Sequence, residues 1–316
     1  MKGGEQSKIR QWFFSPHLSA GLAMFLWAFS FVVIRGTHEM VPPIGLNFWR
    51  TTVAFLALFA MALPHLRREL GAVLTQWKTF LLLGFVLYIT GNMAVFFGLQ
   101  STTVINGGLV NAMAPIAIVG FSWLLFRETI APLQTLGILI SLVGVVVLIS
   151  RADLGVLAAL NFNRGDLWFL VAVTGWSLYA VLLRRTAPAL HLLVVMAALA
   201  LCGWMFLLPL YIWESLTQRA MEFNAPTVLS IIYLALLSSA SATLLWTRAI
   251  RMLGANRVGL FIHLMPVFSV SLAIIFLGEV LRIFHVVGIG LIGIGIYLTT
   301  VLGRRPADGK SASDSH

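Results

Sequence analysis

The chain has 316 residues, of which 59% are hydrophobic and only 10% are charged. A soluble domain carries about 25% charged residues, so this composition excludes a water-soluble fold and indicates an integral membrane protein. The net charge of +10 does not indicate nucleic-acid binding, because the basic residues flank hydrophobic segments instead of forming one amphipathic face.

Ten apolar runs predict ten transmembrane helices. In lipid the backbone must satisfy its hydrogen bonds internally, so apolar runs of about 17 to 25 residues are expected to span the bilayer as helices. The predicted spans are Leu18–Ile34, Ile44–Leu63, Phe80–Leu99, Val104–Phe126, Leu133–Ser150, Leu167–Leu183, Leu190–Trp213, Val228–Thr247, Val258–Leu277 and Ile283–Val301. No small-residue cleavage site follows the first run, so we expect it to be retained. The predicted fold class is an all-α membrane protein.

The second half of the chain repeats the plan of the first. Residues 113–151 align with residues 264–302 without a gap, at an offset of 151. The aligned pairs are Pro115 with Pro266, Glu128 with Glu279, Gly137 with Gly288 and Gly144 with Gly295, and at an offset of 149 Trp27 aligns with Trp176 and Arg35 with Arg184. Such duplication predicts two five-helix units, at residues 18–150 and 166–302, followed by a disordered cytoplasmic tail at residues 303–316.

Basic residues predict the orientation. With the N-terminus inside, the inner segments hold 15 Lys and Arg residues and the outer loops hold 5. The positive-inside rule then places both termini in the cytoplasm, and we expect a multi-pass protein of the cytoplasmic (inner) membrane. Five helices per half force the halves into opposite orientations, so Glu128 faces the cytoplasm and Glu279 faces outward. Inverted repeats are typical of transporters.

Glycine and proline predict how the helices pack and bend. Gly84, Gly91 and Gly98 recur every seven residues, a spacing that favours close helix packing, with exposure of the backbone to a cavity as the alternative at Gly91. Pro115 and Pro266 interrupt the fourth span of each half. We predict kinks there that serve as hinges for alternating access.

Few charged residues lie near or inside the spans. Glu128 and Glu279 are expected to be structural corner residues, with a coupling role as the alternative, and no other acid falls within a predicted span. Arg50 is the only formal charge inside a span, about 9 Å from its outer end. We expect Arg50 to snorkel or to make a structural pair; the alternative is that it faces the cavity and holds a carboxylate.

Aromatic and neutral polar side chains predict a substrate cavity. Polar groups kept in lipid need partners, which are a helix, water or a substrate. The predicted cavity-lining residues are Trp27, Ser30, Tyr88, Asn92, Asn111, Trp176, Tyr179, Ser239, Thr243, Trp246 and His263. A hydrogen-bonded interior position is the alternative for His263. This lining suits a zwitterionic amino acid or an uncharged metabolite better than a phosphate ester, which needs several buried cations.

The sequence contains no motif for metal binding, nucleotide binding or nucleophilic catalysis. There is no metal-ligand spacing, no phosphate-binding glycine loop and no nucleophile motif. We therefore expect no catalytic residue, no metal and no cofactor, which argues against an ATP-driven pump. The expected partners are a small-molecule substrate and the lipid bilayer, with no nucleic acid and no obligate protein partner.

The duplicated pattern resembles the EamA repeat of the drug/metabolite transporter superfamily. The residues that carry the resemblance are Trp27 with Arg35, Trp176 with Arg184, Pro115 and Pro266, Glu128 and Glu279, and the glycines of each fifth span. The resemblance covers about residues 18 to 302 and implies an inverted-repeat exporter. It also implies a central cavity built from spans 1, 3, 4, 6, 8 and 9, with spans 5 and 10 at the periphery.

The predicted function is export of amino acids or similar small metabolites by alternating access. Within the superfamily, the chain is similar to bacterial amino-acid and metabolite exporters, including those for aromatic amino acids. The alternatives are a multidrug exporter, an exporter of another metabolite such as a nucleoside or a sugar, and, most remotely, an intramembrane enzyme.

Overall fold

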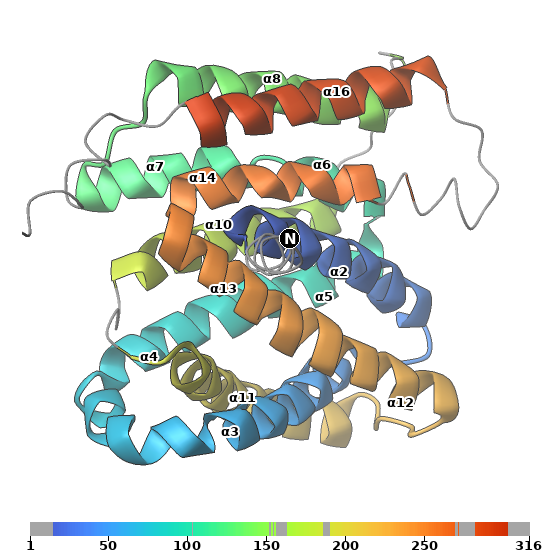
Figure 1. The fold of residues 1–316 in the computed structure, drawn as a ribbon. Coiled ribbons are helices and arrows are strands. Elements are labelled where there is room, and N and C mark those ends of the chain that lie inside the picture. Colours follow the sequence, from blue (N-terminus) through green and yellow to red (C-terminus); the bar gives the residue numbers. More distant parts are fainter. Residues whose placement is uncertain are drawn as a thin grey trace, which may run out of the picture.

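The computed structural model describes residues 15–102, 104–151, 153, 155, 163–185, 190–268, 271 and 282–302. These residues are helical and contain no β-strand (Figure 1). Nine helices in this part of the chain are long and apolar enough to cross a membrane. The prediction of a multi-pass, all-helical protein is therefore confirmed. The Glu279 corner, the tail at 303–316 and part of the predicted span Val258–Leu277 lie outside the described residues.

The first half of the chain supplies five of these spans. They are α2 (Pro16–Thr37), α3 (Pro43–Thr75), a third that joins α4 (Trp77–Phe85), the π-helix η1 (Val86–Met93) and α5 (Ala94–Ser101), a fourth that joins α6 (Val104–Asn111) and α7 (Ala114–Phe126), and α8 (Pro132–Ser150).

The second half of the chain supplies the other spans. They are α10 (Arg164–Arg185), α11 (Leu192–Thr217), a composite of α12 (Ala225–Ile232), the π-helix η2 (Tyr233–Ser241) and α13 (Ala242–Leu253), and α16 (Ile283–Tyr297) with η4 (Leu298–Leu302). Between α13 and α16 lie α14 (Ala255–Gly259) and the short 3-10 helix η3 (Leu260–His263).

Three helices extend beyond their predicted ends. α3 continues from Leu63 to Thr75, α11 continues from Trp213 to Thr217, and α13 continues from Thr247 to Leu253. Charged and polar residues end an apolar run, but they do not end a helix, because a helix that has left the lipid can solvate them. The extension of α11 places Glu214 inside a helix, where it is buried at 2% exposure. Glu214 lies one residue beyond the predicted span Leu190–Trp213, so it is the longer helix, not the predicted span, that contains this acid.

The buried acids stabilise chain segments at helix ends. Glu214 accepts hydrogen bonds from the backbone N–H groups of Ile44 (3.1 Å) and Gly45 (2.6 Å), at the first turn of α3. Asp166, 2% exposed in the first turn of α10, accepts from Asn163 N–H (2.7 Å) and from the Thr102 hydroxyl (2.5 Å). Carboxylates are favourable at helix N-termini, where backbone donors lack intrahelical partners.

Two helix pairs lie at opposite edges of the bundle. α8 lies beside α16 at one edge and α3 packs on α11 at the other, with α2, α10 and α13 between them (Figure 1). The contact between α8 and α16 depends on glycine: a Cβ atom on Gly144 would lie 2.8 Å from the carbonyl oxygen of Gly288. Close approach of backbones replaces the hydrophobic drive that helices lack in lipid.

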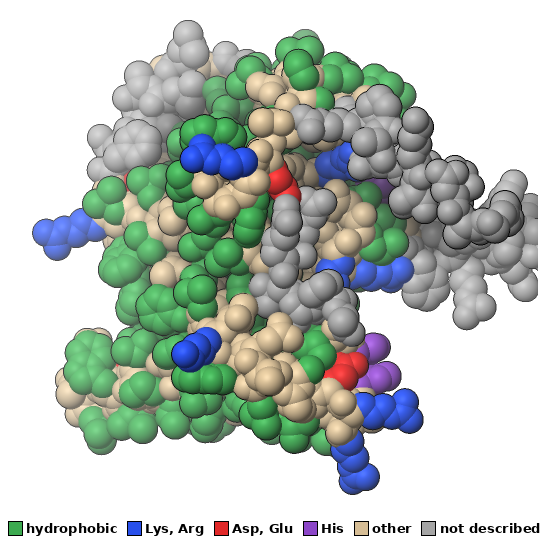
Figure 2. All heavy atoms as spheres, turned by 90° about the vertical axis from the view of Figure 1, so that its left-hand side faces the viewer, with side chains coloured by type: hydrophobic (Ala, Val, Ile, Leu, Met, Phe, Trp, Pro, Cys, Tyr) green, Lys and Arg blue, Asp and Glu red, His purple; other side chains and the backbone are tan. Residues whose placement is uncertain are grey.

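One end of the bundle is basic. Figure 2 views the end where α3 finishes and α4 begins, and Lys and Arg side chains surround it. The basic residues at the helix ends that meet here include Arg67, Arg68, Lys78, Arg127 and Arg251. Large apolar side chains instead cover the outward faces, for example Leu139 of α8 and Val286 of α16, which are 51% and 59% exposed. This pattern fits helices in lipid with charged ends in water.

Candidate functional site

A cavity lies in the middle of the bundle, between residues of both halves of the chain. Ten of the eleven predicted residues line it: Trp27, Ser30, Tyr88, Asn92, Asn111, Trp176, Tyr179, Ser239, Thr243 and Trp246. They come from α2, η1, α6, α10, η2 and α13. Their role in binding substrate stays a prediction. No residue of α8 or α16 contributes to the lining.

His263 lies outside the cavity lining. It is fully buried in η3, where its ring nitrogens form hydrogen bonds with the Ser141 hydroxyl of α8 and with the backbone oxygen of Ala112 (2.8 Å). Ala112 lies between α6 and α7, where the fourth span is interrupted. His263 therefore joins the interrupted segments of the two halves, which is the alternative that the sequence allowed for it.

The predicted hinge prolines lie just beyond these interruptions. Pro115 is the second residue of α7, after the break at Ala112 and Met113. Pro266 follows η3 by three residues. A proline near the start of a helical segment needs no intrahelical donor, so it tolerates this position. Motion about these sites stays a prediction.

Two π-helical segments supply part of the cavity wall. η1 contributes Leu87, Tyr88 and Asn92, and η2 contributes Ser238 and Ser239. A π-helical turn is wide and is found frequently at functional sites, because it turns side chains and carbonyl groups out of the regular ladder. These segments were not predicted from the sequence, since π-helices lack a periodic signal as clear as that of an α-helix.

Two tryptophans of the cavity lining donate hydrogen bonds to the π-helical segments. The indole N–H of Trp27 donates to the backbone oxygen of Ser238 (3.0 Å), and that of Trp176 donates to Asn92 Oδ1 (3.0 Å). Each bond joins one half of the chain to the other. The Trp27 ring also packs against Trp246, with ring centroids 5.5 Å apart. The aromatic walls are thus held by specific partners rather than by packing alone.

Arg50 also lines the cavity and is 5% exposed. Its Nε donates to Asn47 Oδ1 (2.9 Å), its Nη1 donates to the Ser239 hydroxyl (3.1 Å), and its guanidinium carbon lies 4.8 Å from the centre of the Phe96 ring. The snorkelling interpretation is therefore wrong. The structure places Arg50 against the cavity, with neutral structural partners.

The described lining residues include no Asp or Glu. The buried acids Glu214 and Asp166 are held by backbone donors at helix ends, away from the lining. The cavity wall therefore carries one formal charge, the guanidinium of Arg50, among aromatic and neutral polar groups. In addition, no group of three or more His, Cys, Asp or Glu residues within the described ranges is arranged to hold a metal.

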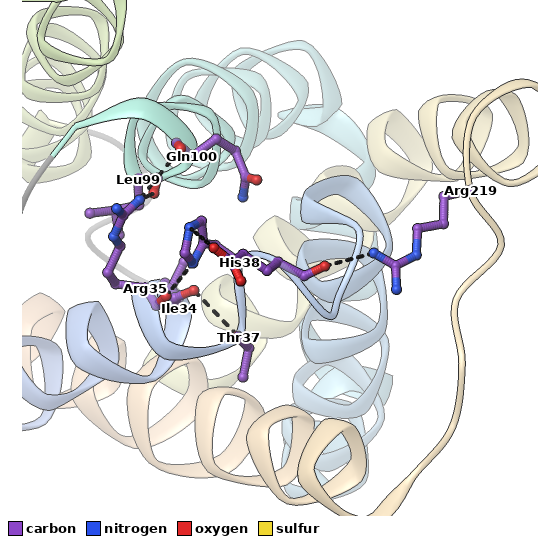
Figure 3. A network of polar contacts seen from close by, with 8 residues as sticks. Ile34, Arg35, Thr37, His38, Leu99, Gln100 and Arg219 are labelled. Carbon is purple, nitrogen blue, oxygen red and sulfur yellow. Dashed lines mark hydrogen bonds and ion pairs between the residues drawn. The ribbon is translucent and has the colours of Figure 1, made fainter.

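The end of the bundle nearest Arg50 is tied together by polar contacts (Figure 3). Arg35, next to the lining residue Ile34, donates to the backbone oxygens of Leu99 (2.6 Å) and Gln100 (3.4 Å) at the end of α5. Arg219 donates to the backbone oxygen of Glu39 (2.7 Å). Cations favour helix C-terminal carbonyls, so Arg35 fixes α2 against α5 at this end of the cavity.

The opposite, basic end has its own polar cluster. The Tyr179 hydroxyl of the lining bonds to Thr247 (3.3 Å), one turn of α13 away from Arg251. Arg251 donates to the backbone oxygen of Leu190 (3.0 Å), while its Nε and Nη2 are buried without a partner in the described part of the chain. Arg251 follows the predicted span Val228–Thr247, where basic residues are ordinary, so its position in the chain does not distinguish it from other basic residues at helix ends.

Comparisons with known proteins agree with this geometry. The chain matches the model of the EamA-like transporter family twice, over residues 15–150 and 163–301. It is similar to an uncharacterized transporter, YetK, of Bacillus subtilis, with 27% identity over 92% of this chain and 88% of the relative.

Other relatives carry more specific names. A probable amino-acid metabolite efflux pump of Salmonella typhimurium is 29% identical over 88% of this chain and 92% of the relative. The Escherichia coli protein of the same name is 28% identical over 90% of this chain and 94% of the relative. A solved crystal structure superposes with a TM-score of 0.74 at 22% identity, covering 92% of this chain and 98% of that one, which shows that the fold is shared.

Proposed function

The chain belongs to the EamA-like transporter family, and from that premise we propose that it exports amino acids or similar small metabolites by alternating access through the central cavity. Proteins of this family are transporters, so an intramembrane enzyme is excluded. The observation that carries the proposal is the cavity between the two halves, lined by ten residues expected from the sequence to face a substrate. Concave sites with aromatic walls and a few placed polar groups are typical of small-molecule binding.

The proposed topology is two inverted five-helix repeats, at residues 18–150 and 166–302, with both termini in the cytoplasm. Ten spans require that the chain cross once more between α13 and α16. The basic end shown in Figure 2 supports an inner position for that end, because Lys and Arg are retained on the cytoplasmic side. We place the protein in the cytoplasmic (inner) membrane.

Cysteine accessibility tests this topology. Cys202 is buried and is the only cysteine, so it can be replaced by serine before new cysteines are added. We expect Glu128→Cys to react with an impermeant maleimide only from the cytoplasm and Glu279→Cys only from outside. Labelling of both positions from the same side would contradict the inverted repeat.

A transport assay tests the function. Purified protein in proteoliposomes is assayed by counterflow with amino acids, sugars, nucleosides and drugs. We expect flux of at least one amino acid, and the names of the Salmonella and Escherichia coli relatives support this choice. If other solutes but no amino acid show counterflow, the proposed substrate is wrong, whereas the proposed transport function stands.

Multidrug export is the second candidate, supported by the aromatic walls formed by Trp27, Trp176 and Trp246. Cationic drugs need an acidic or strongly electronegative partner in lipid-buried sites, and the described lining contains no acid. The cavity charge therefore favours the metabolite exporter. Resistance to bulky cations in cells that express the protein would reverse this order.

A further inference from the structure

We infer that the group recognised in the cavity is a carboxylate, held by Arg50 and Tyr88. The inference rests on the proposed transport function and adds the chemical class of the substrate. It predicts that small organic anions bind in preference to amines and to uncharged analogues of the same shape.

The lining of the cavity carries a positive charge that no described lining residue balances. Arg50 is the only formal charge among the described lining residues, and its bonded partners, Asn47 and Ser239, are neutral. A guanidinium does not lose its proton in proteins, so a positive charge stays in a largely apolar wall. A buried charge is stabilised best by an opposite charge that is also hydrogen-bonded to it. Because the described lining contains no acid, the negative charge that balances Arg50 must come from the bound ligand.

Arg50 and Tyr88 each leave a hydrogen-bond donor for a ligand. Arg50 uses Nε and Nη1 for Asn47 and Ser239, and within the described residues no hydrogen bond engages Nη2. Nor does the Tyr88 hydroxyl bond to any described residue, and Tyr88 lines the same cavity as Arg50. Neither atom is among the buried polar atoms that lack a partner, so both reach the open space of the cavity. The two donors can therefore meet the two oxygens of a carboxylate.

The guanidinium of Arg50 is held in place by its neighbours. Arg50 is the eighth residue of α3, about 10 Å along the helix from its start. The Phe96 ring under its guanidinium and the bonds to Asn47 and Ser239 hold the group in one place. The aromatic wall formed by Trp27, Trp176 and Trp246 then faces the apolar part of the occupant. The site therefore fits an acid with one charged end and an apolar or aromatic body.

The described lining offers no negative charge to a ligand ammonium. Its residues include no Asp or Glu. Asn111 Oδ1 has no hydrogen-bond partner within the described residues, but it is buried away from the open space, and an amide oxygen carries no charge that would balance an ammonium. A zwitterion is compatible with the site because its carboxylate can meet Arg50, whereas an amine without a carboxylate is not.

Binding of matched analogues tests the inference. The intact protein in detergent is titrated by tryptophan fluorescence with 3-phenylpropionate, phenylalanine, 3-phenylpropanamide and phenethylamine, and with the corresponding four compounds that carry an isobutyl group in place of the ring. Within each series we expect the two carboxylates to bind at least about 10-fold more tightly than the amide and the amine, the usual effect of a charge-assisted hydrogen bond.

Two variants assign the preference to the named residues. Arg50→Gln is expected to lose the preference for carboxylates, and Arg50→Lys to keep part of it, because lysine retains the charge without the paired donors. Tyr88→Phe keeps the ring and removes only the hydroxyl, so it reports on the second donor even if Arg50→Gln does not fold. Thr52→Ala is the matched control and should keep the preference, because Thr52 lies on α3 close to Arg50 in the chain but outside the lining, and its hydroxyl bonds to the backbone oxygen of Phe48 in its own helix.

The outcomes separate this inference from the proposed function. Equal binding of amine, amide and carboxylate, or an unchanged preference in both Arg50→Gln and Tyr88→Phe, would overturn the inference. Failure of every carboxylate to bind would also overturn it. Counterflow of any other solute in the same preparation would then leave the transporter standing, whereas absence of all flux beside selective carboxylate binding would contradict the transport function alone.

Discussion

The α8–α16 contact and the central cavity lie in the same bundle but are built differently. Between α8 and α16, Gly144 and Gly288 bring two backbones together, and neither helix contributes to the cavity lining. Beside the cavity, a Cβ atom on Gly175 would lie 2.6 Å from the backbone nitrogen of Gly91, yet the next residues along the two helices, Trp176 and Asn92, line the open space. Glycine thus brings helices together at both places, and what distinguishes the cavity is the set of large amphipathic side chains next to the close approach.

Filling the cavity should break function most strongly. Trp176→Arg or Asn92→Arg places a second cation in a wall that already holds Arg50, and we expect counterflow to fall to background. Trp168→Arg is the matched control, since Trp168 lies near the start of the same helix and is 43% exposed, where an arginine stem can reach the interface. Full flux in both Trp176→Arg and Asn92→Arg would remove the cavity from the transport route.

Filling the α8–α16 contact should break stability instead. In Gly144→Ala the new Cβ would lie 2.8 Å from the backbone oxygen of Gly288 and 2.9 Å from the backbone nitrogen of Ile292, so the helices must separate. We expect a loss of about 1–3 kcal/mol in unfolding free energy, measured by thermal or denaturant unfolding in detergent.

Gly293→Ala on α16 is the control for this contact. A Cβ at Gly293 meets nothing within 4 Å, so alanine should be neutral or stabilise the helix by up to about 1 kcal/mol. Similar effects of the two substitutions would mean that close backbone approach is unimportant at this edge.

Removing the acid cap at the opposite edge should have a smaller effect. Glu214→Gln weakens the bonds to the N–H groups of Ile44 and Gly45, and we expect a loss of about 1 kcal/mol in stability. Substrate affinity should not change, because Glu214 does not line the cavity. Glu222→Gln, an exposed acid in the loop that follows α11, should change neither quantity. A change in substrate affinity without a change in stability would instead assign Glu214 to the transport route.

The smallest effect on stability is expected from the polar contacts of Arg219 and Arg35 shown in Figure 3. Arg219→Gln removes one exposed hydrogen bond to the backbone oxygen of Glu39, which is worth less than about 1 kcal/mol. Arg35→Gln removes contacts with two carbonyl groups at the end of α5 and should cost more. Unfolding temperatures of the two variants check this order, and the reverse order would show that the α2–α5 contact is not what fixes this end.

The sequence predicted the spans well because lipid leaves the backbone few choices. Runs such as Leu133–Ser150 and Ile283–Val301 coincide with observed helical segments to within one or two residues. The larger errors fall at α3, α11 and α13, where the helix continues past its apolar run. Composition reports where a segment leaves the membrane, but helical propensity and caps decide where the helix stops.

The chemical type of the cavity lining was also visible in the sequence, because polar and aromatic groups in an apolar helix need a reason to be there. Trp27, Asn92 and Trp176 follow this rule. His263 also has hydrogen-bonding partners, but they are Ser141 and Ala112, and it does not line the cavity. A polar residue in a membrane helix predicts that a hydrogen-bonding partner exists, but the sequence does not identify that partner.

By itself the sequence determined that this protein is a bundle of apolar helices, duplicated in plan, with few charges and an amphipathic set of residues inside. Only the tertiary structure decided that Arg50 faces the cavity, that Glu214 caps α3, and that π-helical turns open the wall. The physical reason is that the bilayer constrains each helix separately and locally. The rotation of a helix and the partner of a buried charge depend on neighbours that are distant in the chain.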